Sequence, residues 1–267
     1  MANPVLTPKR VNAAVTELEP GWAAPTSTSP STDGSPPTCG PADQLMSANG
    51  TFAKTFLLWL GLLAGGVFGW SRVTVDVLGN TKVPGWMLIV LLGALALAMI
   101  CIFKPNLARI AAPLYSLTQG VFLGAISHLY EARWNGIVIQ AVLATAAVFV
   151  VCLALYVTGV VKVTNKFMVV VFAATAGIFV LYFASFLLSI FGVDLAFWNQ
   201  PSALGIGFSV LVCIVASLNL FVDFEFIRRM VVAGSPKQME WYGAFGITVT
   251  IVWLYVELLR LLSLLRR

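Results

Sequence analysis

Two acidic side chains stand in or beside long apolar stretches near the carboxyl end of this 267-residue chain. Asp223 follows the apolar run 204–222, and Glu257 lies inside the apolar run 242–265. An ionisable side chain at membrane depth is costly, so it usually faces a bundle interior or a water path and marks a functional site. We therefore expect Asp223 and Glu257 to carry the chemistry of this protein.

Two carboxylates that meet in a low-dielectric site cannot comfortably both ionise, so they share a proton. Protonation favours a closed, hydrogen-bonded pair and deprotonation separates the two groups, which makes a pH gate. The ionised oxygens also suit calcium, but two carboxylates fall short of the roughly six to eight oxygen ligands of a tight site. Calcium bound by Asp223 and Glu257 is therefore expected to be transient, as in a leak path.

Whether the two acids meet depends on the turn between their helices. Straight antiparallel helices centred on Lys237 displace Asp223 from Glu257 by about six residues, or roughly 9 Å in depth. The lean of side chains toward the helix amino terminus narrows this gap, and contact stays open. Glu257 has an alternative role, because Arg260 is three residues on and the two can form an ion pair that only fixes the bundle.

Familiar catalytic motifs are missing from the sequence. It has one histidine, His128, and no Gly-x-Ser-x-Gly, His-Glu-x-x-His, phosphate loop or Cys-x-x-Cys. An intramembrane aspartyl protease also has acids on two late helices, but it needs Gly-x-Gly-Asp at the second, and residues 251–257 contain no such motif. We expect no catalytic residue, no cofactor and no enzymatic activity.

The composition is that of a membrane protein. The chain is 59% hydrophobic and 10% charged, whereas soluble domains have about 25% charged residues. Each apolar span is near the roughly 20 residues that a bilayer core requires. The seven spans are 52–70, 86–103, 110–129, 137–161, 167–191, 204–222 and 242–265. The sequence predicts an all-α, polytopic bundle of seven transmembrane helices, with the lipid bilayer as its partner.

A tail precedes the first span. Residues 1–50 hold eight of the thirteen prolines, mixed with serine, threonine and glycine. Such a segment cannot bury enough apolar surface to offset chain entropy. We predict a disordered tail over residues 1–45 and one transmembrane domain over residues 46–267. Within that domain, Gly61-x-x-x-Gly65 and Gly120-x-x-x-Gly124 predict close helix packing.

The loop charges indicate orientation. The second, fourth and sixth loops hold Lys104, Arg109, Lys162, Lys166, Arg228, Arg229 and Lys237. The first, third and fifth hold Arg72, Lys82 and Arg133. The positive-inside rule then places the amino terminus in the cytoplasm. We interpret the net charge of +5 as a topology signal and expect no nucleic-acid partner.

The carboxyl-terminal motifs resemble a known family. They are Leu220-Phe221-Val222-Asp223-Phe224-Glu225-Phe226-Ile227 and Trp253-Leu254-Tyr255-Val256-Glu257-Leu258-Leu259-Arg260. Both resemble the last two helices of the Bax inhibitor-1, or transmembrane Bax inhibitor motif, family. The resemblance covers residues 46–267 and extends to a bacterial branch through Met46-Ser47-Ala48-Asn49-Gly50-Thr51.

This resemblance implies seven helices with the last one central, in the cell membrane of a bacterium. It also implies a proton-sensitive calcium leak gated by a pair of acids, which fall on Asp223 and Glu257, with Arg109 as the nearest candidate for a closing partner. We expect a pH-sensitive calcium leak channel, for which calcium and protons are partners. The alternative is a non-conducting regulator that binds another membrane protein, such as a membrane protease.

Overall fold

The computed structural model describes residues 45–73, 85–191 and 202–266, so nearly all of the predicted tail lies outside the described residues. Within these ranges, seven helices are long and apolar enough to cross a membrane, which confirms the predicted all-α class. They are α2 (Ala48–Arg72), α3 (Trp86–Phe103), α4 (Ala108–Glu131), α5 (Ile137–Val157), α6 (Asn165–Ile190), α7 (Ala203–Val232) and α8 (Met239–Leu265). A 3-10 turn, η2 (Pro105–Leu107), leads into α4.

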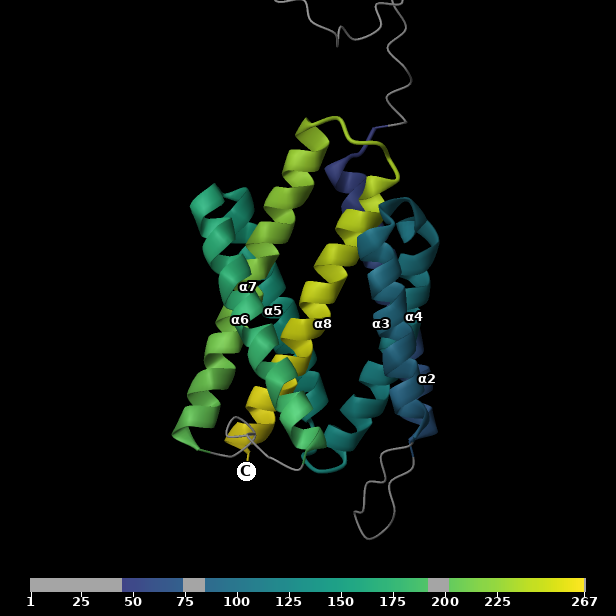
Figure 1. The fold of residues 1–267 in the computed structure, drawn as a ribbon, viewed down its shortest axis with the longest axis vertical. Coiled ribbons are helices and arrows are strands. Elements are labelled where there is room, and N and C mark those ends of the chain that lie inside the picture. Colours follow the sequence, from purple (N-terminus) through teal and green to yellow (C-terminus); the bar gives the residue numbers. More distant parts are fainter. Residues whose placement is uncertain (1–44, 74–84, 192–201, 267) are drawn as a thin grey trace, which may run out of the picture. The chain divides into compact units, whose positions relative to one another are not determined.

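The last helix occupies the middle of the bundle. Figure 1 shows α8 running between a group formed by α5, α6 and α7 and a group formed by α2, α3 and α4. It contacts α2, α4, α5 and α7. Half of an apolar 18-residue stretch of α8 is buried in the protein, whereas only 11% of the corresponding stretch of α6 is buried. Helix α6 therefore faces lipid and α8 faces protein. The predicted central position of the last helix is confirmed.

Glycines bring α2 and α4 into backbone contact. A Cβ atom added to Gly65 would lie 2.2 Å from the carbonyl oxygen of Leu117, and one added to Gly124 would lie 1.9 Å from that of Gly66. No side chain fits at such distances. The small residues therefore let the two parallel helices pack backbone to backbone, as the glycine spacing predicted.

Helix α7 is longer than the apolar run that predicted it. The run ends at residue 222, whereas the helix continues to Val232. The added turns carry Glu225, Arg228 and Arg229, and each arginine forms an ion pair with Glu225 along the helix. Because opposite charges at these spacings support a helix, the charged residues extend α7 rather than end it. Helix α5 differs the other way: it ends at Val157, before the predicted residue 161.

Candidate functional site in α7 and α8

Asp223 lies on the face of α7 that packs against α8. The Thr250 hydroxyl of α8 donates a hydrogen bond of 2.6 Å to Asp223 Oδ2. Gly246, one turn earlier on α8, leaves room for the carboxyl group, since its added Cβ would lie 3.7 Å from Asp223 Oδ1. Among the described residues, no lysine, arginine or histidine lies within ion-pair distance of this half-buried carboxyl group. Asp223 therefore has a hydroxyl partner and no cationic one.

Glu257 is buried at the meeting of three helices. Ser209 of α7 donates to Glu257 Oε1 at 2.7 Å, and Tyr182 of α6 donates to Oε2 at 3.2 Å. Arg260 Nη1 lies 3.3 Å from Glu257 Oε1 and also donates to the Tyr182 hydroxyl at 2.5 Å. The charge of Glu257 is thus matched by Arg260, and the cluster joins α6, α7 and α8.

The structure holds Asp223 and Glu257 at different depths. No hydrogen bond joins the two carboxyl groups, and each is held by different partners. Glu257 follows Thr250 by seven residues on α8, which is about 10 Å of helical rise. This distance is close to the roughly 9 Å that the sequence indicates. The lean of the side chains does not close the gap, because side chains of neighbouring helices bind each carboxyl group at a different depth.

Arg109 stands apart from both acids. It lies in the first turn of α4 with its side chain exposed. No ion pair joins it to Asp223 or Glu257. Its role as a closing partner, which the resemblance implies, stays a prediction.

Glu225 is a buried acid that the sequence analysis did not single out. Arg228 Nη2 and Arg229 Nε donate to Glu225 Oε1 at 2.7 and 2.9 Å, and the Tyr156 hydroxyl of α5 donates to Oε2 at 3.0 Å. Arg229 also donates to Asn165 Oδ1 of α6 at 3.0 Å. The cluster ties α7 to α5 and α6. Its sequence signal was the spacing of three and four residues from Glu225 to the two arginines.

Glu240 is a second buried acid outside the predicted site. The backbone N–H and hydroxyl of Ser47 donate to Glu240 Oε1 at 2.9 and 3.0 Å, and Lys54 forms an ion pair with Oε2. Gly50 has no room for a side chain, because its added Cβ would lie 2.4 Å from Glu240 Oε1. These contacts hold the start of α2 against the start of α8. Glu240 lies just before the predicted span 242–265, and charged residues are common at the ends of such spans.

Seven helices able to span a bilayer, found among the described residues, make this a multi-pass membrane protein, and the acids Asp223 and Glu257 link its last helices to their neighbours.

The family model described as Bax inhibitor 1 like matches residues 3–267. The chain therefore belongs to the Bax inhibitor 1 like family, as its motifs around Asp223 and Glu257 predicted. A comparison with curated proteins finds no match.

Proposed function

We propose that this protein provides a pH-sensitive calcium leak along α7 and α8, in which Asp223 takes up either a proton or a calcium ion. The observation that carries the proposal is the setting of Asp223. It is an acid within a membrane-spanning helix, it accepts a hydrogen bond from Thr250, and no cationic side chain among the described residues is paired with it.

A carboxylate in this setting is stabilised by binding a cation. An unpaired charge at membrane depth is expensive, and a proton or a metal ion relieves that expense. Carboxylate and hydroxyl oxygens are hard ligands that suit calcium, but one of each is far from the roughly six to eight oxygens of a tight calcium site. Asp223 and Thr250 would therefore bind calcium briefly and release it, and a proton on Asp223 would compete with calcium for the same oxygens.

The Glu257 cluster has a different part in this proposal. Arg260 already neutralises Glu257, and Tyr182 and Ser209 occupy the remaining carboxylate oxygen positions. A cation passing this level must displace Arg260 or separate the helices. We infer that Asp223 senses pH and that the Glu257–Arg260 pair closes the path, so the two acids act in series. This replaces the single proton shared between them that the sequence suggested.

Reconstitution separates conduction from the alternative of a non-conducting regulator. The full chain is placed in liposomes loaded with calcium and a calcium indicator, with protein-free liposomes as the control. We expect calcium efflux above the control, with a rate that changes between about pH 6 and pH 8, the range over which a perturbed carboxyl group can titrate. Efflux equal to the control at every pH would contradict conduction and favour the regulator.

A further inference from the structure

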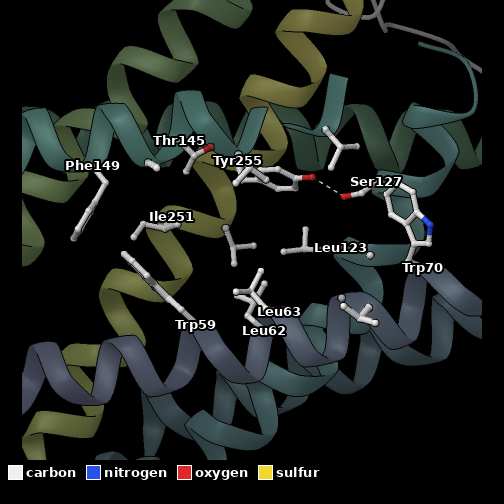
Figure 2. Close-up of a pocket in the computed structure, with 17 residues that line it drawn as sticks. Trp59, Leu62, Leu63, Trp70, Leu123, Ser127, Thr145, Phe149, Ile251 and Tyr255 are labelled. Carbon is white, nitrogen blue, oxygen red and sulfur yellow. Dashed lines mark hydrogen bonds between the residues drawn. The ribbon is translucent and has the colours of Figure 1, made fainter. Parts of the chain in front are cut away.

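A cavity of about 500 Å³ lies between α2, α4, α5 and α8, away from the acids described above. Figure 2 shows side chains that line it, with Trp59, Phe149 and Ile251 toward one side of the view and Ser127 and Trp70 toward the other. This volume falls within the roughly 300 to 1,000 Å³ of ligand sites. Its lining is almost wholly apolar, so it suits an apolar ligand.

The cavity opens sideways from the bundle. Leu63 and Val67 of α2 and Val142 of α5 line it and are 61%, 73% and 47% exposed. These residues belong to membrane-spanning helices, so what reaches the opening is the hydrocarbon of the bilayer. The most abundant molecule able to enter from that side is a lipid acyl chain.

One end of the cavity has polar groups with a donor to spare. The hydroxyl groups of Ser127 and Tyr255 lie 2.6 Å apart and share one hydrogen bond, shown in Figure 2. Each hydroxyl has one O–H donor, and the hydrogen bond between them uses one of the two. Among the described residues, no acceptor is found for the remaining O–H. An ester carbonyl, the group that links a lipid headgroup to its chains, can accept it.

Positive charge gathers at this same end. Trp70 lines the cavity, and Arg72 ends the helix that carries it. Arg133 follows the end of α4, and Arg266 follows α8 and donates to the Asn135 carbonyl oxygen at 2.8 Å. The carboxyl ends of α2 and α8 both lie at the lower end of the bundle in Figure 1. The carboxylate of Glu131 also lies here, but the backbone N–H groups of Gly136 and Val138 bind it.

We propose that this cavity binds one acyl chain of an anionic phospholipid. The chain runs from Tyr255 toward Phe149, its ester carbonyl accepts the spare hydroxyl proton, and its negatively charged headgroup lies beside Arg72 and Arg133. Arginines near the membrane surface attract anionic headgroups. An acyl chain makes no favourable contact with water, so it loses none when it enters the apolar cavity. The site is separate from Asp223 and does not depend on calcium conduction.

Two neighbouring alanines on α5 provide a matched test of the chain site. Both are exposed, but Ala146 lines the cavity and Ala147 does not. The full chain is reconstituted in equal amounts of phosphatidylglycerol and phosphatidylcholine with identical chains, extracted in detergent and weighed by native mass spectrometry. We expect one retained phosphatidylglycerol per protein. Ala146→Trp should lower its retention at least about tenfold, because each buried methylene contributes to chain binding, and Ala147→Trp should not.

Arg72 provides the test of the headgroup site. Arg72→Gln should lower the preference for phosphatidylglycerol over phosphatidylcholine roughly fivefold, as expected from losing one basic residue at the surface. Lys104→Gln, which removes a charge at the opposite end of α3 and α4, should leave the preference unchanged. Equal retention of the two lipids by the wild-type protein, or equal losses in the two tryptophan variants, would overturn the proposal. If Ala146→Trp does not fold, Ala146→Leu makes the same comparison with a smaller side chain.

Discussion

At the scale of single residues, the two acids predicted from the sequence differ in how their charge is compensated. Glu257 has a cation, Arg260, and two hydroxyl donors, whereas Asp223 has one hydroxyl donor. A residue pattern can show that an acid lies in an apolar helix, but it cannot show which side chains other helices bring to it. Arg260 was visible as a partner because it is three residues away on the same helix.

The sequence did not predict that Glu225 and Glu240 are buried, for a related reason. Both stand near the end of an apolar run, where charged residues are ordinary, and both prove to be buried. Ser47 and Glu240 are 193 residues apart in the chain. No local pattern relates positions at such a distance, so the burial of Glu240 could only come from the fold.

The Glu257–Arg260 pair leads to a prediction about stability. Arg260→Ala leaves Glu257 buried without its cation, which should cost about 3 kcal/mol, as for other broken buried pairs. Glu257→Gln keeps the shape and can still bond to Ser209 and Tyr182, but it leaves the largely buried Arg260 without its anion, so it should destabilise the protein by a similar amount. Thermal unfolding in detergent measures both. A melting temperature of Arg260→Ala equal to that of the wild type would contradict the assigned pair.

At the scale of elements, apolar runs predicted the helices well and their ends less well. The span 86–103 was predicted with the bounds that the structure gives, because in the sequence Pro84-Gly85 precedes it and Lys104-Pro105-Asn106 follows it. The end of α7 was missed because a hydrophobic run stops at the first charges, whereas a helix stops where its backbone loses partners. Glu225 and its arginines keep that backbone helical up to Val232.

The close contact of α2 and α4 leads to a prediction for Gly124. Gly124→Ala places a methyl group 1.9 Å from the carbonyl oxygen of Gly66, so the helices must separate. We expect a loss of about 2 kcal/mol, typical of an overpacked interior. Gly207→Ala in α7 is the matched control, because nothing lies within 4 Å of its added Cβ. Unfolding in denaturant should show the loss for Gly124→Ala alone; equal stability of the two variants would argue against tight packing.

At the scale of the whole molecule, composition predicted a membrane protein, because a chain this apolar has few other ways to satisfy its backbone, and the seven apolar spans predicted seven helices. The orientation of that bundle remains a prediction from the loop charges. Helix α5 joins the loop at Asn135 to the loop at Lys162, so these loops should lie on opposite sides of the membrane.

A labelling experiment tests this orientation. Single cysteines are introduced at Asn135 and at Lys162 in a chain whose native cysteines are replaced by alanine or serine. A membrane-impermeant thiol reagent added to intact cells should label Asn135→Cys and not Lys162→Cys, because the positive-inside rule places Lys162 in the cytoplasm. Labelling both from outside would exclude a single crossing by α5, and the reverse pattern would invert the orientation.

The amino-terminal tail leads to a prediction with an internal control. Deleting residues 1–44 should leave the melting temperature in detergent within a few degrees of the wild type, because a segment of this composition buries little apolar surface. Deleting residues 1–47 also removes Ser47, which donates two hydrogen bonds to the buried Glu240. That longer deletion should lower the melting temperature. A large drop for the shorter deletion would show that the tail packs on the bundle.

The most direct test of the central claim is the pH dependence of calcium efflux in Asp223→Asn. Loss of a proton turns Asp223 into the negative group that attracts calcium, so wild-type efflux should rise from about pH 6 to pH 8. The amide in Asp223→Asn cannot titrate, and efflux should become independent of pH. Glu131→Gln, which neutralises an acid that binds the start of α5, should keep the wild-type response. A wild-type pH response in Asp223→Asn would contradict the account.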